Sequence, residues 1–253
     1  MKSRLRAALT HLAFSTLIAV LVGLLVFGVW YRQPFGELLG GHELFLWVIF
    51  VDVTLGPLLT FVVFNPAKPR AELVRDIGII VLVQLLALAY GIYVMSLARP
   101  VWVAQEGDRF RVVRRADIDM KALGEAPAAL RSLSWTGPEW LATRLSRSTD
   151  RDYVESIQRS IAGDHPSFRP GRWLPYGEEK MEGIKNALPL AQLIQKKPAL
   201  AAGIDQYLQQ KKLDRERLMY MPLIAGETND WIVLLDRHSA EPVGFLHVDG
   251  WME

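Results

Sequence analysis

The sequence predicts an α+β fold class in which three N-terminal transmembrane helices precede a separate α+β domain with an antiparallel sheet. Hydrophobic residues make up 51% of the 253-residue chain, which is more than a typical soluble domain contains. The charges are unevenly distributed, because residues 1–97 carry only 12 of them and residues 98–253 carry 44. We therefore expect a membrane domain over residues 1–98 and a soluble domain over residues 99–253, the latter long enough to bury its own core.

Three apolar segments are long enough to cross the hydrocarbon core of a bilayer, which takes about 20 helical residues. They are expected at about residues 12–31, 44–64 and 77–97. The first segment follows three basic residues, as the apolar part of a signal peptide does, but no small-residue cleavage site follows it. We interpret this first span as an uncleaved anchor.

Basic residues in the short connections predict the orientation of these spans. Three lie before the first span and three lie in residues 65–76, whereas residues 32–43 contain only one. The N-terminus and residues 65–76 are therefore expected in the cytoplasm. An odd number of spans then places the C-terminal domain on the other side. In a Gram-negative cell this predicts a multi-pass inner-membrane protein with a periplasmic domain.

Asp52 is the most informative residue of the membrane domain, because it is the only charged residue of the second span. An ionisable group at mid-bilayer costs roughly 3 kcal/mol on insertion scales and usually faces a partner or the helix interior. A rise of about 1.5 Å per residue places Asp52 level with Tyr90, and places Gln84 near the height of Thr60. Two interpretations stay open: hydrogen bonds within the three-helix unit, or a polar seat for another membrane helix.

The pair Gly56-Pro57 is compatible with the second interpretation. Pro57 frees the carbonyl of Val53 from its helical partner, and Gly56 lets a neighbouring backbone approach. An intramembrane Asp would also suit an ion-coupled transporter. Three spans without internal repeats are, however, too few for a carrier unless it oligomerises.

The soluble domain is predicted to begin as a β-hairpin directly after the third span and to end in three strands. The hairpin strands are residues 101–105 and 109–113, and the C-terminal strands are residues 217–224, 231–236 and 242–248. The residues between them, 116–212, follow a mostly helical pattern. This order is typical of one sheet with helices over one face.

Two helices of the soluble domain have recognisable ends. The first covers residues 152–162, with Thr149 or Asp150 as its cap and Gly163 as its stop. The second covers residues 198–211 and has a proline in its first turn.

Catalytic motifs are absent: the sequence has no Gly-x-Ser-x-Gly, no phosphate-binding glycine loop and no His-Glu-x-x-His. It also has no cysteine, which excludes thiol chemistry and cysteine-based metal sites. His238 and His247 lie near acidic residues, but the geometry of the last hairpin separates them by about 20 Å, too far to share a metal. The net charge of +2 gives no basic field for nucleic acid. We expect no catalysis, cofactor, metal or nucleic-acid partner.

The loop of residues 168–176 mixes aromatic residues, arginines and prolines, a composition found in many protein-contact loops. Its candidate contact residues are Arg172, Trp173 and Tyr176. The alternative is that Trp173 and Tyr176 hold the loop on the sheet.

The second span carries the run Val-Asp-Val-Thr-Leu-Gly-Pro-Leu-Leu-Thr at residues 51–60, followed by Val-Phe-Asn-Pro at residues 63–66 and by Ala98-Arg99-Pro100. Together with Gln84 and Tyr90-Gly91, this pattern resembles the TfpX/TfpZ type IV pilin accessory proteins. Shorter segments of the soluble domain are similar to the same family, at residues 135–138, 173–176, 221–223 and 231–236. The resemblance implies an inner-membrane protein that is encoded with a particular major pilin and promotes its assembly into surface fibres, without catalytic activity.

A pilin subunit in the membrane has one apolar helix and one periplasmic head, so the hypothesis has two contacts. The membrane domain would bind the pilin helix and the periplasmic domain would bind the head. The candidate residues on the membrane side are Asp52, Gly56, Pro57, Thr60, Gln84 and Tyr90. Pilus assembly platform proteins and membrane lipid are further expected partners. The action is left open between stabilising pilin, delivering it to the assembly machinery and controlling retraction.

Two other functions are kept as alternatives. A small α+β domain tethered by helices also suits a periplasmic sensing or regulatory module, although the chain ends at Glu253 without a cytoplasmic output domain. A membrane enzyme that modifies pilin would place its chemistry at Asp52, which is too deep, or in the soluble domain, which lacks a recognisable pair of carboxylates.

Overall fold

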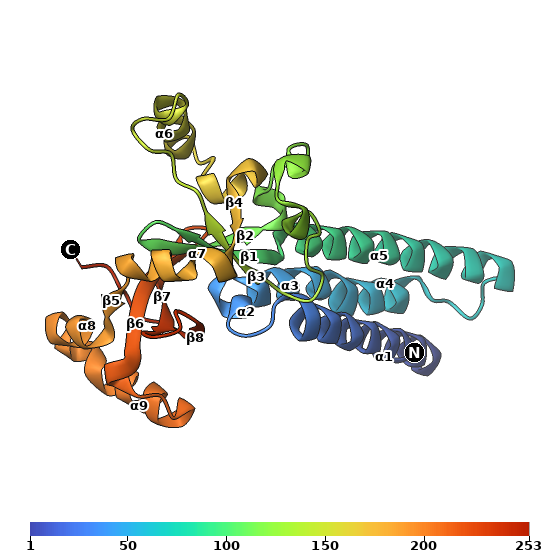
Figure 1. Ribbon diagram of the computed structural model, residues 1–253. Coiled ribbons are helices and arrows are strands. Elements are labelled where there is room, and N and C mark those ends of the chain that lie inside the picture. The colour runs from blue at the N-terminus through green and yellow to red at the C-terminus, as the bar shows by residue number, and fades with distance from the viewer. Residues whose placement is uncertain (253) are drawn as a thin grey trace. The chain divides into compact units, whose positions relative to one another are not determined.

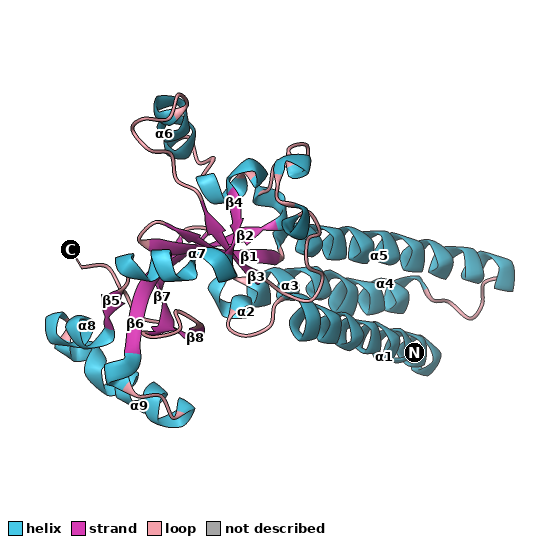
Figure 2. Ribbon diagram, in the orientation of Figure 1, coloured by secondary structure: helices cyan, strands magenta, loops and turns pink. Residues whose placement is uncertain are grey.

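The computed structural model describes residues 1–252, which form two compact units. The helical unit covers residues 1–99 and the α+β unit begins at Pro100. Figure 1 shows both units in one chain, and Figure 2 shows that the strands belong to the second unit alone. The observed fold class, apolar helices followed by an α+β domain, confirms the predicted one.

The helical unit contains three long helical segments, each long and apolar enough to cross a membrane. The first is α1 (Lys2–Leu25) with the π-helical turn η1 (Val26–Trp30); the second is α3 (Gly41–Phe50), the π-helical turn η2 (Val51–Leu55) and α4 (Gly56–Val63); the third is α5 (Arg70–Ala98). A short helix, α2 (Phe35–Leu38), lies between the first two. The three segments contain most of the predicted spans.

Close packing and long-range hydrogen bonds hold these helices together. Gly91 of α5 lies so near α3 that an added Cβ would be 2.5 Å from a methyl carbon of Val48. The Tyr31 hydroxyl is buried and donates to the carbonyl of Met95, 3.2 Å away. Lipid tails are as apolar as these side chains, so helix association depends on such contacts rather than on the hydrophobic effect.

The second helical segment changes its hydrogen-bond pattern over Val51–Leu55, just before Pro57. Pro57 has no N–H to donate to the carbonyl of Val53, and its ring would clash with that carbonyl in a regular α-helix. A π-helical turn absorbs this conflict while the segment continues. Asp52 lies in this turn and is buried.

The α+β unit is built on one sheet, which over residues 100–252 has eight strands in the order β4-β3-β1-β2-β6-β7-β8, with β5 paired to β6. The strands are β1 (Pro100–Glu106), β2 (Arg109–Arg114), β3 (Glu139–Thr143), β4 (Trp173–Pro175), β5 (Leu188–Pro189), β6 (Leu218–Ala225), β7 (Thr228–Asp236) and β8 (Pro242–Leu246). The α-helices are α6 (Tyr153–Ile161), α7 (Tyr176–Gly183), α8 (Leu190–Lys196) and α9 (Ala201–Lys211). The predicted hairpin and the three C-terminal strands are confirmed.

Three details of the expected secondary structure are wrong. The sheet is mixed rather than purely antiparallel, because β1 pairs with β3 and β2 with β6 in parallel. Residues 116–212 are less regularly helical than predicted, since β3, β4, β5 and several 3-10 turns lie among the α-helices. The residue at the start of α6 is Asp152 rather than Thr149 or Asp150, and its side chain caps no backbone N–H because it pairs with Arg172. The other predicted helix begins as a 3-10 turn at Pro198 and continues as α9.

Two apolar clusters and a buried ion pair hold the α+β unit together. One cluster surrounds Trp102 and Trp173, whose ring centroids are 5.7 Å apart, and the other packs α8 and α9 against β6 and β7. Glu106 and Arg111 form an ion pair across the β1–β2 hairpin, 3.3 Å apart and buried. Glu106 also accepts a hydrogen bond from the Ser167 hydroxyl at 2.5 Å, which ties the hairpin to residues 163–172.

Candidate functional site

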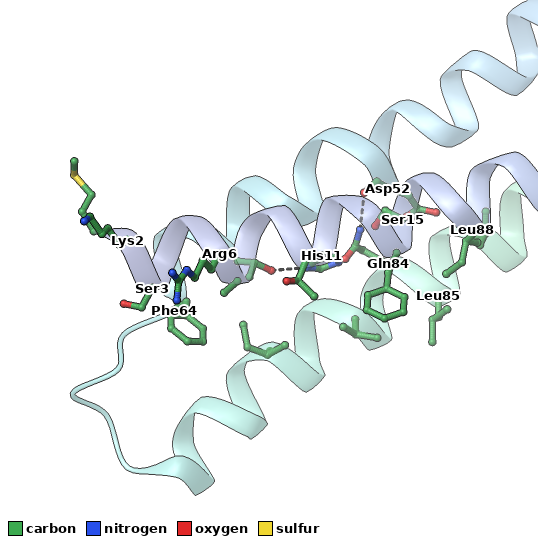
Figure 3. A pocket seen from close by; sticks show the side chains of 18 residues that line it. Lys2, Ser3, Arg6, His11, Ser15, Asp52, Phe64, Gln84, Leu85 and Leu88 are labelled. Carbon is green, nitrogen blue, oxygen red and sulfur yellow. Dashed lines mark hydrogen bonds between the residues drawn. The ribbon is translucent and has the colours of Figure 1, made fainter.

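Polar side chains from all three long helical segments line one groove of the helical unit (Figure 3). The groove has a volume of about 1080 Å³ and is lined by residues of α1, of the second helical segment and of α5. Both α1 and α5 pack against the second segment, so that this segment forms the floor and the other two form the walls. A groove between two membrane helices is a place where another apolar chain can lie.

The walls of the groove are apolar and open. They include Phe14 and Ile18 from α1, and Val81, Leu85 and Leu88 from α5. Phe14 is 63% exposed and Leu85 is 51% exposed, so these side chains have no packing partner on their outer side. Exposed apolar side chains at membrane depth contact lipid or a second protein helix.

The floor of the groove is polar and includes Asp52 and Thr60, with Gln84 beside them on α5. Asp52 is only 8% exposed, and its backbone carbonyl accepts a hydrogen bond from the Gln84 side-chain nitrogen at 3.0 Å. His11 of α1 is 2.5 Å from the Thr60 hydroxyl through Nδ1. These two contacts connect α5 and α1, respectively, to the second segment.

Two buried acceptor atoms in this floor have no hydrogen-bond partner among the residues that the structure describes: Oδ1 of Asp52 and Oε1 of Gln84. A buried polar atom without a partner costs free energy, and most such atoms in proteins are paired. The groove therefore contains acceptor capacity that the helical unit itself does not use.

Gly56 leaves the space that the Gln84 side chain of α5 occupies against the second segment. A Cβ at this position would lie 2.0 Å from the side-chain nitrogen of Gln84 and 2.4 Å from its carbonyl oxygen. Neither atom pair tolerates such a distance, so any other residue at position 56 would displace the Gln84 amide. Pro57 is buried beside it.

The structure brings together five of the six residues predicted for the membrane side of the site. They are Asp52, Gly56, Pro57, Thr60 and Gln84. Tyr90 lies elsewhere: it is 69% exposed and does not line the groove. The expected heights were wrong, because α5 begins at Arg70, seven residues before the predicted third span. Counted from Arg70, Gln84 rises about 21 Å and reaches Asp52, and Tyr90 lies above it.

Sequence reasoning missed His11 and Ser15 on the α1 wall. They are four residues apart, which places them on the same face of the helix, and Ser15 is buried. This spacing of two polar residues within an apolar span is a signal that the sequence contains. Lys2 and Arg6 have the same spacing and lie at the end of the groove where α1 begins (Figure 3).

The candidate contact loop of the α+β unit packs inward. Trp173 is buried, and its ring nitrogen donates to the carbonyl of Ser167 at 2.8 Å. The Tyr176 hydroxyl donates to the carbonyl of Ala240 at 2.9 Å, and burial raises the pKa of this phenol. Arg172 is buried and pairs with Asp152. All three side chains hold the loop in place, as the alternative interpretation predicted for Trp173 and Tyr176, and none of them offers an exposed contact surface.

The histidines of the last hairpin are separate from each other. The ring of His247 stacks on Trp231 at a centroid distance of 4.5 Å, and its Nε2 is 2.9 Å from Asp230. His238 lies in the β7–β8 turn, where its backbone N–H donates to Asp236 at 3.0 Å. Such hydrogen bonds, above all from the N–H of Ser239, lower the pKa of Asp236 to about 2. Within residues 1–252 no group of three or more metal-ligating side chains comes together.

Comparisons with known proteins give one family. The family model described as fimbrial assembly protein FimB matches residues 1–40, which include all of α1. The fimbrial assembly proteins of serogroup I and serogroup E1 from Dichelobacter nodosus are 34% and 33% identical over 229 residues, each covering 90% of this chain and 89% of the relative.

A third relative, the fimbrial assembly protein of serogroups C1 and C2 from the same organism, is 40% identical over 116 residues. These residues are 46% of this chain and 88% of that relative. No solved structure matches the chain.

Proposed function

Because the chain belongs to the fimbrial assembly protein family, we propose that it is a membrane-anchored accessory factor in the assembly of type IV pili. The relatives match over nearly their full length, so both units of the chain take part in the similarity. The resemblance of residues 51–66 to the TfpX/TfpZ accessory proteins makes a cognate major pilin the proposed partner. The proposed role is chaperone-like and non-enzymatic.

The groove of the helical unit is the observation that carries this proposal. Its volume of about 1080 Å³ equals that of roughly 14 Å of an α-helix 10 Å in diameter. The groove therefore has room for about three turns of a helix, and a longer helix could lie along it with one side buried between α1 and α5. The apolar walls match the single apolar helix by which a pilin subunit is held in the membrane.

The proposed orientation places the N-terminus in the cytoplasm and the α+β unit in the periplasm, where it would contact the pilin head. Basic residues at the start of α1 and in residues 65–76 support it through the positive-inside rule. A membrane-impermeant maleimide should then label an Asp108→Cys variant from the periplasm and an Ala67→Cys variant only after lysis. The reverse pattern would overturn the orientation.

Filling the groove tests the function. Leu85 lines the groove, so a Leu85→Trp substitution should occupy the space proposed for the pilin helix. We expect surface pili, counted by electron microscopy and by the pilin content of sheared fibres, to fall to the level of a gene deletion. The variant protein should still accumulate in the membrane, because its new side chain enters open space rather than a packed core.

Leu86→Trp is the matched control. Leu86 is next to Leu85 on α5 and is also exposed, but it does not line the groove. Its substitution should leave piliation unchanged. Normal piliation in Leu85→Trp, at normal protein levels, would contradict the role of the groove, and normal piliation in the deletion strain would contradict the proposed function itself.

A further inference from the structure

The floor of the groove contains buried polar atoms that need a hydrogen-bond donor, which the apolar walls do not supply. Asp52 is more than nine-tenths buried, lines the groove, and has one carboxylate oxygen without a hydrogen-bond partner among the described residues. The neighbouring Gln84 has an unpaired acceptor oxygen as well. Two unpaired acceptors side by side call for a donor from outside the helical unit.

The donors close to Asp52 in the structure are already engaged or directed elsewhere. The Gln84 amide nitrogen donates to the Asp52 backbone carbonyl, and His11 is paired with Thr60. Ser15 lies on the α1 wall, and no hydrogen bond joins it to Asp52. Gln84 and His11 both interact with the Asp52 carboxylate, but neither pairs with Oδ1.

Lipid acyl chains cannot supply the hydrogen-bond donor that Asp52 and Gln84 need. Asp52 lies 11 residues before the end of α4 at Val63, which is a rise of about 17 Å. This depth is near the middle of a hydrocarbon core about 30 Å thick. Acyl chains, which fill this depth, contain no hydrogen-bond donor. A protein helix can carry a donor at any depth, and membrane helices use such groups to bind one another.

We propose that the helix bound in the groove carries a hydrogen-bond donor, an amine, amide or hydroxyl group, that pairs with Asp52 at the groove floor. This inference rests on the proposed function, since it specifies the chemistry of the pilin helix that the groove would bind. The apolar walls provide the contact area, and the donor fixes the height of the helix in the groove. Asp52 is thus a recognition residue for a partner helix.

Photo-crosslinking in native membranes tests the donor. A photoreactive phenylalanine derivative replaces Phe14, which lines the groove and is exposed, in the full-length chain. With Asp52 intact, we expect irradiation to capture the pilin helix. Asp52→Leu should reduce the captured fraction by about 3- to 30-fold, the range that membrane hydrogen bonds between helices support. Asp52→Asn keeps an acceptor oxygen and should retain most of the capture.

Thr54→Val is the matched control, because Thr54 lies in the same helical turn as Asp52 but is exposed away from the groove. It should capture pilin at the wild-type level. A second photoreactive position, Phe50, is exposed on α3 outside the groove and should capture none in any background.

The outcomes separate this inference from the proposed function. Equal capture of pilin by wild type and Asp52→Leu would overturn the proposed hydrogen bond to Asp52 but would not contradict the proposed function. Capture of lipid alone, or of no pilin, by the wild type would overturn both. If Asp52→Leu does not accumulate, the donor is sought on the other side, by replacing the polar residues of the captured pilin helix with apolar ones, one at a time. One of these replacements should reduce capture by the same factor. If none of them reduces it, the inference is overturned.

Discussion

At the scale of single residues, the groove depends on the contact among Asp52, Gly56 and Gln84. The Gln84 amide reaches the Asp52 carbonyl only because Gly56 has no Cβ. The carbonyl lies in the π-helical turn that Pro57 imposes. The Gly56-Pro57 pair, which follows Asp52 by one helical turn, thus shapes the second segment and leaves room for the Gln84 amide of α5.

A Gly56→Ala substitution tests this contact. Its Cβ would overlap the Gln84 amide, which must then move and lose its hydrogen bond to Asp52. We expect the helical unit to lose about 1 kcal/mol of stability, the magnitude of interhelical hydrogen bonds in membranes. Unfolding of the full chain in mixed detergent micelles measures the loss.

Gly78→Ala is the control, because Gly78 is on the same helix as Gln84 and a Cβ there meets no atom within 4 Å. It should leave stability unchanged or raise it slightly. The combination Gly56→Ala with Gln84→Ala should cost no more than Gln84→Ala alone, since both remove one contact. Additive losses would show that Gly56 acts through something other than Gln84.

The sequence identifies some residues of the groove and not others, for physical reasons. Asp52, Thr60 and Gln84 could be predicted because a polar side chain in an apolar span usually faces another helix rather than lipid. Tyr90 was misplaced because heights counted from the ends of apolar runs ignore the helical turns outside the hydrocarbon. His11 escaped notice because it lies close to the basic N-terminus, where polar residues are ordinary.

At the scale of elements, the β1–β2 hairpin depends on the Glu106–Arg111 pair. Both side chains are buried, and Glu106 also accepts a hydrogen bond from the hydroxyl of Ser167, which lies in the 3-10 turn η6 (Pro166–Phe168). Taking two charges out of water is costly unless each compensates the other. The pair therefore fixes the register between the hairpin and η6 more than it adds net stability.

A Glu106→Ala substitution should be strongly destabilising, by about 3 kcal/mol or more, because it leaves the buried Arg111 guanidinium without its partner. The free energy of unfolding of the full chain, followed by tryptophan fluorescence in denaturant, measures this loss. Replacing both residues by apolar ones, Glu106→Leu with Arg111→Met, should recover part of it.

The same hairpin provides the matched control. Asp108 and Arg109 form an ion pair 2.8 Å apart at the exposed turn. Asp108→Ala should change the free energy of unfolding by no more than about 0.5 kcal/mol, since exposed pairs contribute little. Similar losses for Glu106→Ala and Asp108→Ala would mean that burial of the inner pair has no energetic consequence.

Elements were predictable in proportion to their length and regularity. The three apolar helices and the hairpin at residues 100–114 have strong local signals, and so do β6, β7 and β8. The strands β4 and β5 have only three and two residues, which is too short to display an alternating pattern. The parallel pairs β1–β3 and β2–β6 depend on the path of the chain between the strands, about which local sequence says nothing.

At the scale of the whole molecule, the chain combines a lipid-embedded groove with an α+β unit that follows the third span directly. The helix α5 ends at Ala98 and β1 begins at Pro100. Such a chain suits a partner that is itself half in the membrane, as a pilin subunit is. We propose that the groove between α1 and α5 binds the pilin helix.

Disulfide crosslinking tests this claim most directly, because the chain has no cysteine of its own. A single Leu85→Cys in the groove is combined with single cysteines at successive positions of the pilin helix, and Leu86→Cys is the control. We predict that Leu85→Cys forms disulfides with pilin positions three to four residues apart, the repeat of one helical face, and that Leu86→Cys forms none. No disulfide from Leu85→Cys, or equal yields from both positions, would contradict the claim.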